Sequence, residues 1–280
     1  MLAAVSPGGL LRESVKDATL QVPGAPNALA ARLIEREGYA AAYFSGAALS
    51  AGVMAMPDVG LFTLTELAQQ ARYVCQSTRI PVIVDADTGF GEADNVARTI
   101  VELERAGAAA VQLEDQQFPK RCGHLAGKTL IETDHMCEKI AAAVEAKQDQ
   151  ELVLIARTDA RAVEGMPEAL LRAKKYVEAG ADWIFPEALQ SKEEFQEFAD
   201  TNDVPLIANM TEFGKSPLLS LGDLAQLGYA CVLYPVTLLR IAMKAMETAL
   251  ALIGDEGSQA SLLDLMQTRE ELYELLEYEP

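Results

Sequence analysis

The sequence predicts an α/β fold in which eight short strands alternate with eight helices and close into a (β/α)8 barrel of the TIM type. One observation is a recurring joint, in which a glycine ends a helix and an apolar strand begins directly after it. Gly38, Gly107, Gly180 and Gly228 mark four such joints. The other is the chain length of 280 residues, since single α/β barrels often run to about 250 residues. Eight alternations favour a closed barrel over an open sheet.

Each predicted strand is a short apolar run followed by a polar loop. The strands are expected at residues 20–22, 42–45, 82–85, 110–114, 153–157, 183–187, 206–209 and 231–234. The helices are expected at 25–37, 65–77, 95–105, 134–147, 167–179, 192–200, 222–227 and 237–252, after a lead-in, residues 1–18, with a short helix at 10–16. No Pro/Ser-rich linker or change of composition divides the chain, so residues 1–280 are expected to form one barrel domain.

The C-terminal tail, residues 255–280, predicts an additional acidic helical segment at 258–278. Its apolar residues cannot all be buried by one isolated helix. Two arrangements remain open. The tail packs on a neighbouring subunit, or it folds back on its own barrel.

The charge balance excludes some partners. The chain has 42 acidic and 23 basic residues and a formal net charge of -19, which repels nucleic acid and anionic membranes. No apolar run reaches the roughly 18 residues of a membrane span. The four cysteines are scattered without metal-knuckle spacing, which is typical of a reducing compartment and predicts a cytoplasmic protein.

Polar residues stand where the predicted strands end. In a (β/α)8 barrel these ends face one mouth, where the chemistry takes place. Asp85 and Asp87 follow the third strand and Glu114 ends the fourth. This oxygen-rich set suits Mg2+ or Mn2+ better than zinc. The alternative, an acidic turn that caps a helix, does not account for two Asp residues emerging from a buried strand.

Arginines near the strand ends indicate the class of substrate. Arg157 and Arg240, with Arg269 in the tail, can each hold a carboxylate by two parallel hydrogen bonds. Together with a metal site, they predict a small polycarboxylate substrate.

A reactive thiol is predicted beyond the fourth strand, where Lys120, Arg121, Cys122, Gly123 and His124 follow one another. Cationic neighbours stabilise a thiolate and make a cysteine reactive. The alternative is a surface basic cluster that happens to contain a cysteine. Because Cys122 lies well past the strand end, loop 118–129 must carry it inward, and this loop and loop 49–61 are candidate lids over the mouth.

Several sequence runs resemble the isocitrate lyase / phosphoenolpyruvate mutase superfamily over nearly the whole chain. They are K-R-C-G-H at 120–124, D-A-D-T-G-F-G at 85–91, L-E-D-Q at 113–116, A-R-T-D at 156–159, F-P-E-A at 185–188 and N-M-T-E-F-G at 209–214. Within the superfamily the closest likeness is to the 2-methylisocitrate lyases. That likeness implies cleavage of (2R,3S)-2-methylisocitrate to pyruvate and succinate in the methylcitrate cycle of propionate catabolism, by a Mg2+-dependent homotetramer.

The resemblance also implies residue roles. Mg2+ would lie at Asp85 and Asp87, near Glu114, and Cys122 would act as general acid with Lys120 and Arg121 as its cationic neighbours. Substrate contacts are implied at Ser45, Gly46, Ala47, Cys122, Gly123, Arg157, Glu187, Asn209, Met210, Thr211, Arg240 and Arg269. Ala47 departs from the pattern, since the family commonly has Gly there.

Three questions stay open at this point. The base that removes the hydroxyl proton is Tyr43, Asp58 or a metal-bound water. The substrate is methylisocitrate or a related acid, 2,3-dimethylmalate or isocitrate. A third alternative is a catalytically silent barrel that binds a dicarboxylate.

Overall fold

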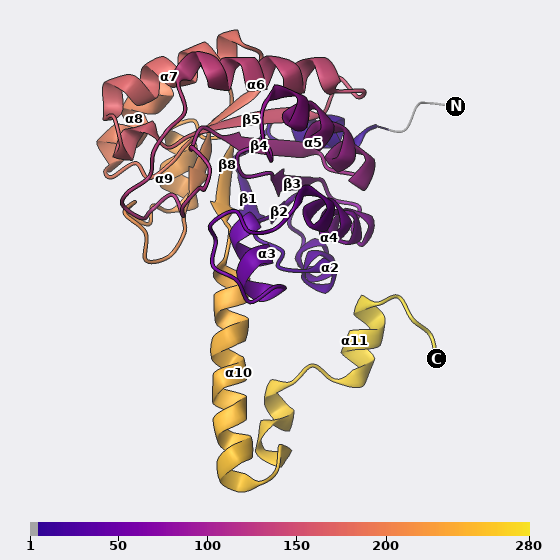
Figure 1. Cartoon of the computed structure of the whole chain (residues 1–280). Coiled ribbons are helices and arrows are strands. Elements are labelled where there is room, and N and C mark those ends of the chain that lie inside the picture. Colours follow the sequence, from indigo (N-terminus) through magenta and orange to yellow (C-terminus); the bar gives the residue numbers. More distant parts are fainter. Residues whose placement is uncertain (1–4) are drawn as a thin grey trace.

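The computed structural model describes residues 5–280, and eight parallel strands form its centre (Figure 1). They are β1 (Leu20–Pro23), β2 (Ala42–Phe44), β3 (Val82–Asp85), β4 (Ala110–Glu114), β5 (Val153–Thr158), β6 (Trp183–Pro186), β7 (Ile207–Asn209) and β8 (Cys231–Tyr234). Strands β2 to β6 form one sheet in chain order, and β7, β8 and β1 form the other. Parallel bridges from Gly24 to Tyr43 and from Ile184 to Leu206 join the two sheets at both seams. The predicted TIM-type barrel is therefore confirmed, with every strand within one residue of its expected bounds.

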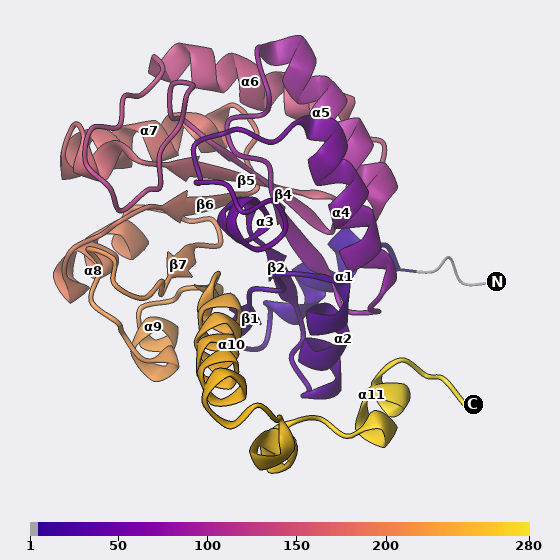
Figure 2. The same ribbon diagram turned by 60° about the horizontal axis from the view of Figure 1, so that its bottom comes forward.

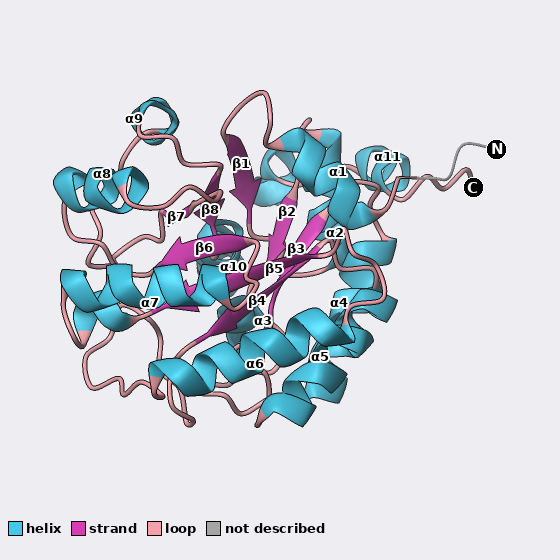
Figure 3. Ribbon diagram, turned by 90° about the horizontal axis from the view of Figure 1, so that it is seen from above, coloured by secondary structure: helices cyan, strands magenta, loops and turns pink. Residues whose placement is uncertain are grey.

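Seven helices surround the strands (Figures 2 and 3). They are α2 (Ala28–Arg36), α4 (Leu64–Gln76), α5 (Ala93–Ala106), α6 (Thr133–Ala146), α7 (Met166–Glu178), α8 (Lys192–Asp200) and α9 (Leu221–Gln226). The strands are buried on both faces, as their continuous apolar runs predict. In β5, Ile155 belongs to the core inside the barrel, whereas its neighbours Leu154 and Ala156 belong to the core shared with the helices.

The joints form as the sequence predicts. Gly107 ends α5 in the left-handed region, with φ of +100°, and its N–H donates to the carbonyl oxygens of the last helical turn. A residue with a Cβ is strained at this φ. The chain can therefore turn directly from α5 into β4.

Three local expectations were wrong. Helix α3 (Gly46–Gly52) occupies the start of the expected loop 49–61, and the side chain of Ser45 caps it by accepting from the N–H of Ala48. The tail is not one helix, because a 3-10 turn (Ala260–Leu265) and helix α11 (Arg269–Leu275) are separate elements. The lead-in helix α1 (Pro7–Ser14) begins three residues early, and residues 1–4 of the lead-in lie outside the described part.

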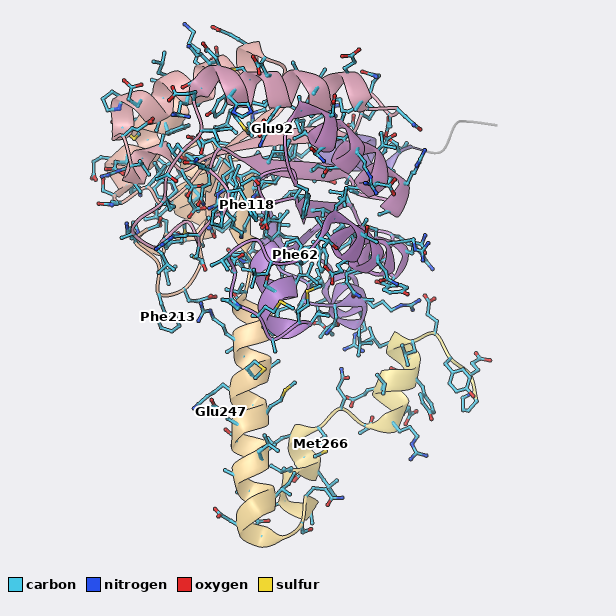
Figure 4. The ribbon with its side chains drawn as sticks, viewed as in Figure 1. Phe62, Glu92, Phe118, Phe213, Glu247 and Met266 are labelled. Atoms are coloured by element: carbon cyan, nitrogen blue, oxygen red, sulfur yellow. The ribbon has the colours of Figure 1, made fainter. Side chains whose placement is uncertain are left out.

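Helix α10 (Thr237–Glu256) follows β8 but does not cover the barrel. It projects away from the strands, with Glu247 on it and Met266 beyond it, both distant from the barrel (Figures 1 and 4). None of its residues is buried, and Leu250 is 70% exposed. Across residues 5–280, no helix is both long and apolar enough to span a membrane.

The end of the tail returns to its own barrel. Arg32 on α2 donates to the carbonyl oxygen of Leu275 at 3.1 Å, and the side chain of Leu275 is buried. The C-terminal helix therefore packs on its own subunit, whereas α10 leaves its apolar side chains exposed.

Candidate active site

A cavity of about 110 Å3 lies at the carboxyl ends of the strands. Its lining includes most of the predicted site residues: Ser45, Ala47, Asp85, Lys120, Arg121, Cys122, Gly123, Arg157, Glu187, Asn209, Thr211 and Arg240. A larger cavity of about 1000 Å3 lies beside it, near the starts of α4, α5 and α6, and contains none of the predicted site residues. We assign the active site to the smaller cavity, because the charged strand ends converge there.

Asp85 is held rigidly at the end of β3. Its Oδ2 accepts from the N–H of Gly46 at 3.1 Å, and its Oδ1 accepts from the side-chain amide of Gln112 at 3.1 Å. Gln112 in turn accepts from the hydroxyl of Tyr43 at 2.8 Å. Gly46 therefore acts through its backbone, and the carboxylate of Asp85 keeps a fixed orientation.

Asp87 has the features of a ligand for a hard cation. It follows β3 with φ of +47° and is buried. Its Oδ2 has no hydrogen-bond partner, and Lys120 Nζ lies 2.9 Å from its Oδ1. Burial raises the pKa of Asp87 to about 7, against the opposing effect of Lys120. A buried carboxylate with so few donors is suited to a bound cation.

Glu114 offers a further oxygen but does not complete a protein-only cage. Its Oε1 has no hydrogen-bond partner, and its Oε2 lies 3.4 Å from Arg157 Nη1. In the chain from residue 5 onward, no three His, Cys, Asp or Glu side chains converge closely enough to hold a metal. This donor set fits Mg2+, which usually binds through one or two carboxylates and keeps several waters.

Lys120 is committed to carboxylates. Its buried ammonium group lies between Asp58 and Asp87. Burial alone would lower the pKa of Lys120. The neighbouring Asp87 and Glu114 outweigh this effect and raise the pKa of Lys120 above its ordinary value. Arg121 is exposed. Lys120 is thus paired with acidic residues, and its role as a cationic neighbour of the Cys122 thiol stays a prediction.

Arg157 is the central cation of the pocket. Its Nε lies 3.0 Å from Asp159 Oδ2 and 3.5 Å from Glu187 Oε2, and its guanidinium lies over the ring of Phe185 at 5.3 Å. Burial works against ionisation, but the surrounding carboxylates raise the pKa of Arg157 above its usual range. Arg157 therefore stays charged at the wall of the pocket.

The Cys loop, residues 118–129, is folded into the mouth. A Cβ on Gly123 would lie 2.3 Å from Arg157 Nη2, so only glycine allows this approach. His124 Nε2 lies 2.7 Å from Glu187 Oε1. Burial alone would raise the pKa of Glu187, but Arg157 and His124 outweigh this effect and hold the pKa of Glu187 at about 2. The loop thus brings Cys122, which is half-buried, to the pocket wall.

Comparison with known proteins decides the family. The sequence profile of the phosphoenolpyruvate phosphomutase family matches residues 11–253.

The chain belongs to the phosphoenolpyruvate mutase/isocitrate lyase superfamily.

Its relatives in this superfamily are lyases and related enzymes. The 2-methylisocitrate lyase of Aeropyrum pernix is 54% identical over 273 residues, which cover 97% of this chain and 88% of that protein. The crystal structure of 2,3-dimethylmalate lyase matches with a TM-score of 0.91 at 35% identity, covering 97% of this chain and 92% of that one. Phosphonopyruvate hydrolase, in complex with oxalate and Mg++, matches with a TM-score of 0.88 at 30% identity, covering 97% and 95%.

Met210 and Arg269 lie apart from the pocket, and Arg240 lines it only at the mouth. Met210 is buried, and its sulfur accepts from the N–H of Leu219. Arg240 lines the mouth, but its guanidinium is stacked on the exposed ring of Phe213 at 5.4 Å. Arg269 is exposed at the start of α11 and does not line the pocket.

Sequence reasoning missed two buried residues behind the pocket, Lys128 and Asp159, which pair at 2.5 Å. Asp159 stands in the A-R-T-D run and Lys128 four residues after His124. Their positions beside known motifs were the available signal.

Proposed function

We propose that this protein cleaves (2R,3S)-2-methylisocitrate to pyruvate and succinate. The observation that carries the proposal is the convergence of Cys122, Arg157 and Asp85 on one small pocket, with Asp87 directly behind. The identity of 54% to a 2-methylisocitrate lyase supports the same reaction. A dicarboxylate-binding barrel without activity would not need a half-buried thiol brought to the pocket by its own loop.

The apolar part of the pocket favours a substrate with a methyl group. Phe185, Leu233 and Pro235 line it beside the charged residues. Phe185 and Leu233 are almost fully buried. An apolar wall of this kind stabilises a methyl group by removing it from water.

Asp85 and Asp87 would hold Mg2+, or Mn2+ in its place, which when bound supplies Lewis-acid polarisation of the substrate's 2-hydroxy acid oxygens. Arg157 would bind and orient a substrate carboxylate. As the bond between C2 and C3 breaks, the electron pair stays on the carbon that becomes part of succinate. Cys122 Sγ then gives its proton to that carbon as general acid.

The base for the hydroxyl proton is better assigned to Asp58 than to Tyr43. Burial and the neighbouring Asp85 raise the pKa of Tyr43 well above its ordinary value, and its hydroxyl already donates to Gln112. Asp58 lines the pocket, and Lys120 holds its carboxylate in place.

Substrate preference tests the proposal. The value of kcat/KM should be highest for methylisocitrate and lower by about 10–200-fold for isocitrate, which lacks the methyl group. Measurements on methylisocitrate, isocitrate and 2,3-dimethylmalate with one enzyme preparation give this ranking. A preference for dimethylmalate would contradict the substrate assignment, and binding without turnover of any of the three would contradict the enzyme assignment.

We also propose that α10 is an assembly element and that the protein is a homotetramer, as the superfamily resemblance suggests. Met243, Met246, Leu250 and Ile253 recur at helical spacing and are all exposed. Exposed apolar stripes of this kind mark interaction surfaces. Arg269 would then serve a neighbouring subunit's mouth, since it does not line its own.

Introducing Met246→Glu and Leu250→Glu together should reduce the sedimenting mass below that of the wild type at micromolar concentration. Burying two unpaired carboxylates at an interface is unfavourable. Thr248→Glu, at an exposed position between them, is the matched control and should change the mass much less. A wild-type protein that sediments as a 30.2 kDa monomer would overturn the proposal.

A further inference from the structure

One lysine of the Cys loop lies outside the pocket and is almost completely buried. The side chain of Lys128 is 1% exposed, and it does not line the cavity. Burying an ammonium group is unfavourable unless it is paired and hydrogen-bonded. Its two partners therefore indicate what this lysine does.

The first partner lies within the loop itself. Lys128 Nζ donates to the carbonyl oxygen of Gly123, the residue that follows Cys122. This contact folds the second half of the loop across the first. Because the backbone of Gly123 lies against Arg157, the same contact fixes how deeply Cys122 enters the mouth.

The second partner belongs to the barrel. Lys128 Nζ lies 2.5 Å from Asp159 Oδ1, and Asp159 is fully buried just after β5. The carboxylate of Asp159 also accepts from Arg157, at 3.0 Å from Nε and 3.2 Å from Nη2. The N–H of Asp159 donates to Asp115 at 2.9 Å. Asp159 is thus a fixed point that holds the loop through Lys128 and the substrate-binding arginine on its other side.

We propose that Lys128 is a positioning residue that holds the Cys loop closed. It keeps Cys122 at the pocket and, through Asp159, ties the closed loop to the orientation of Arg157. The link to catalysis rests on the proposed function, in which Cys122 is the general acid. Lys128 touches neither substrate nor the reacting atoms, so its loss acts on the geometry of the protonation step.

Lys128→Met keeps the length of the side chain and removes the ammonium group. The value of kcat should fall about 10²-fold, because a misplacement of about 1 Å costs that much in rate. The KM should change less than kcat, since Arg157 keeps its direct contacts with Asp159.

Lys147→Met is the matched control. Lys147 is also buried, with its side chain 6% exposed, and its Nζ also contacts a backbone carbonyl, at Leu152, and an aspartate, Asp182. These contacts lie before β5 and β6, at the opposite end of the barrel. The control variant should keep the wild-type kcat.

Alkylation of Cys122 by iodoacetamide, followed by peptide mass spectrometry without substrate, measures loop opening directly. Lys128→Met should accelerate it by about tenfold or more, since losing the contact favours local opening. This measurement does not depend on the reaction catalysed. A wild type that cleaves none of the three acids would overturn the proposed function, whereas faster alkylation of the variant would still support the closed-loop role.

Chemical rescue separates positioning from general damage. In Lys128→Ala, added propylammonium should restore part of the lost kcat by occupying the vacated space beside Asp159. Lys128→Gln takes the place of the methionine variant if the latter does not fold. A variant with unchanged Cys122 alkylation and a kcat within about twofold of wild type would overturn the proposal.

Discussion

Replacing Cys122 by serine should lower kcat by about 10²–10⁴-fold, the usual contribution of a general acid. Serine keeps the shape of the side chain, but its hydroxyl is far too weak an acid to protonate the carbanion in the same step. The KM should change much less, because Arg157 and the carboxylates of Asp85 and Asp87 remain in place. Steady-state kinetics on methylisocitrate give both parameters.

The other cysteines provide the control. Cys137 is partly buried on α6, where its thiol contacts the carbonyl oxygen of Lys175, and Cys137→Ser should keep near-normal kcat.

Iodoacetamide should inactivate the wild type through Cys122, and succinate should slow the inactivation. Burial raises the pKa of Cys75 to about 12 and also raises that of Cys231, so these thiols should react slowly. A Cys122→Ser enzyme with near-normal kcat would remove the thiol from the mechanism.

The barrel was predictable because its strands are buried on both faces. A run such as Val82–Asp85 is apolar until it reaches the mouth, and a glycine such as Gly107 fixes where the preceding helix ends. Helix α3 was missed because its seven residues, G-A-A-L-S-A-G, are mostly small and show no amphipathic period. Its cap by Ser45 was the only local signal.

The break in the tail had a readable signal as well. The side chain of Thr268 caps α11, and the carboxylate of Glu271 accepts a hydrogen bond from the N–H of Thr268. A threonine followed three residues later by glutamate marks a new helix start. The apolar residues of the tail predicted one longer helix, and the capping box that starts a second helix was not considered.

The site residues were predictable by type but not by partner. Placing Asp87 and Lys120 at the mouth follows from strand ends and motif, but their 2.9 Å contact depends on how the Cys loop folds. The pair of Lys128 and Asp159 joins residues 31 positions apart. Such pairings arise from loop conformation, which neither periodicity nor composition encodes.

Replacing Asp87 by alanine should abolish both the activity and its response to added Mg2+. EDTA should stop cleavage by the wild type and Mg2+ should restore it, whereas Asp87→Ala should lose about 10³-fold or more in kcat with no recovery on adding Mg2+. Lewis-acid stabilisation by a metal is worth several kcal/mol, and each 1.36 kcal/mol is tenfold in rate. Asp94→Asn, an exposed aspartate on α5, is the control and should keep wild-type kcat and metal response.

Thermal unfolding gives a second test of Asp87 as a metal ligand, and this test is independent of activity. The pKa of Asp87 is raised from 3.8 to about 7 by burial, so between these values the folded state binds more protons at this group than the unfolded state. Its contribution to stability is therefore lost as the pH rises towards 7. Asp87→Ala should leave the metal-free protein at least as stable as the wild type at pH 8, and should remove the rise in Tm that Mg2+ gives the wild type. A metal-free wild type with full turnover, or an Asp87→Ala protein whose Tm still rises with Mg2+, would overturn the assignment of Asp87 as a metal ligand.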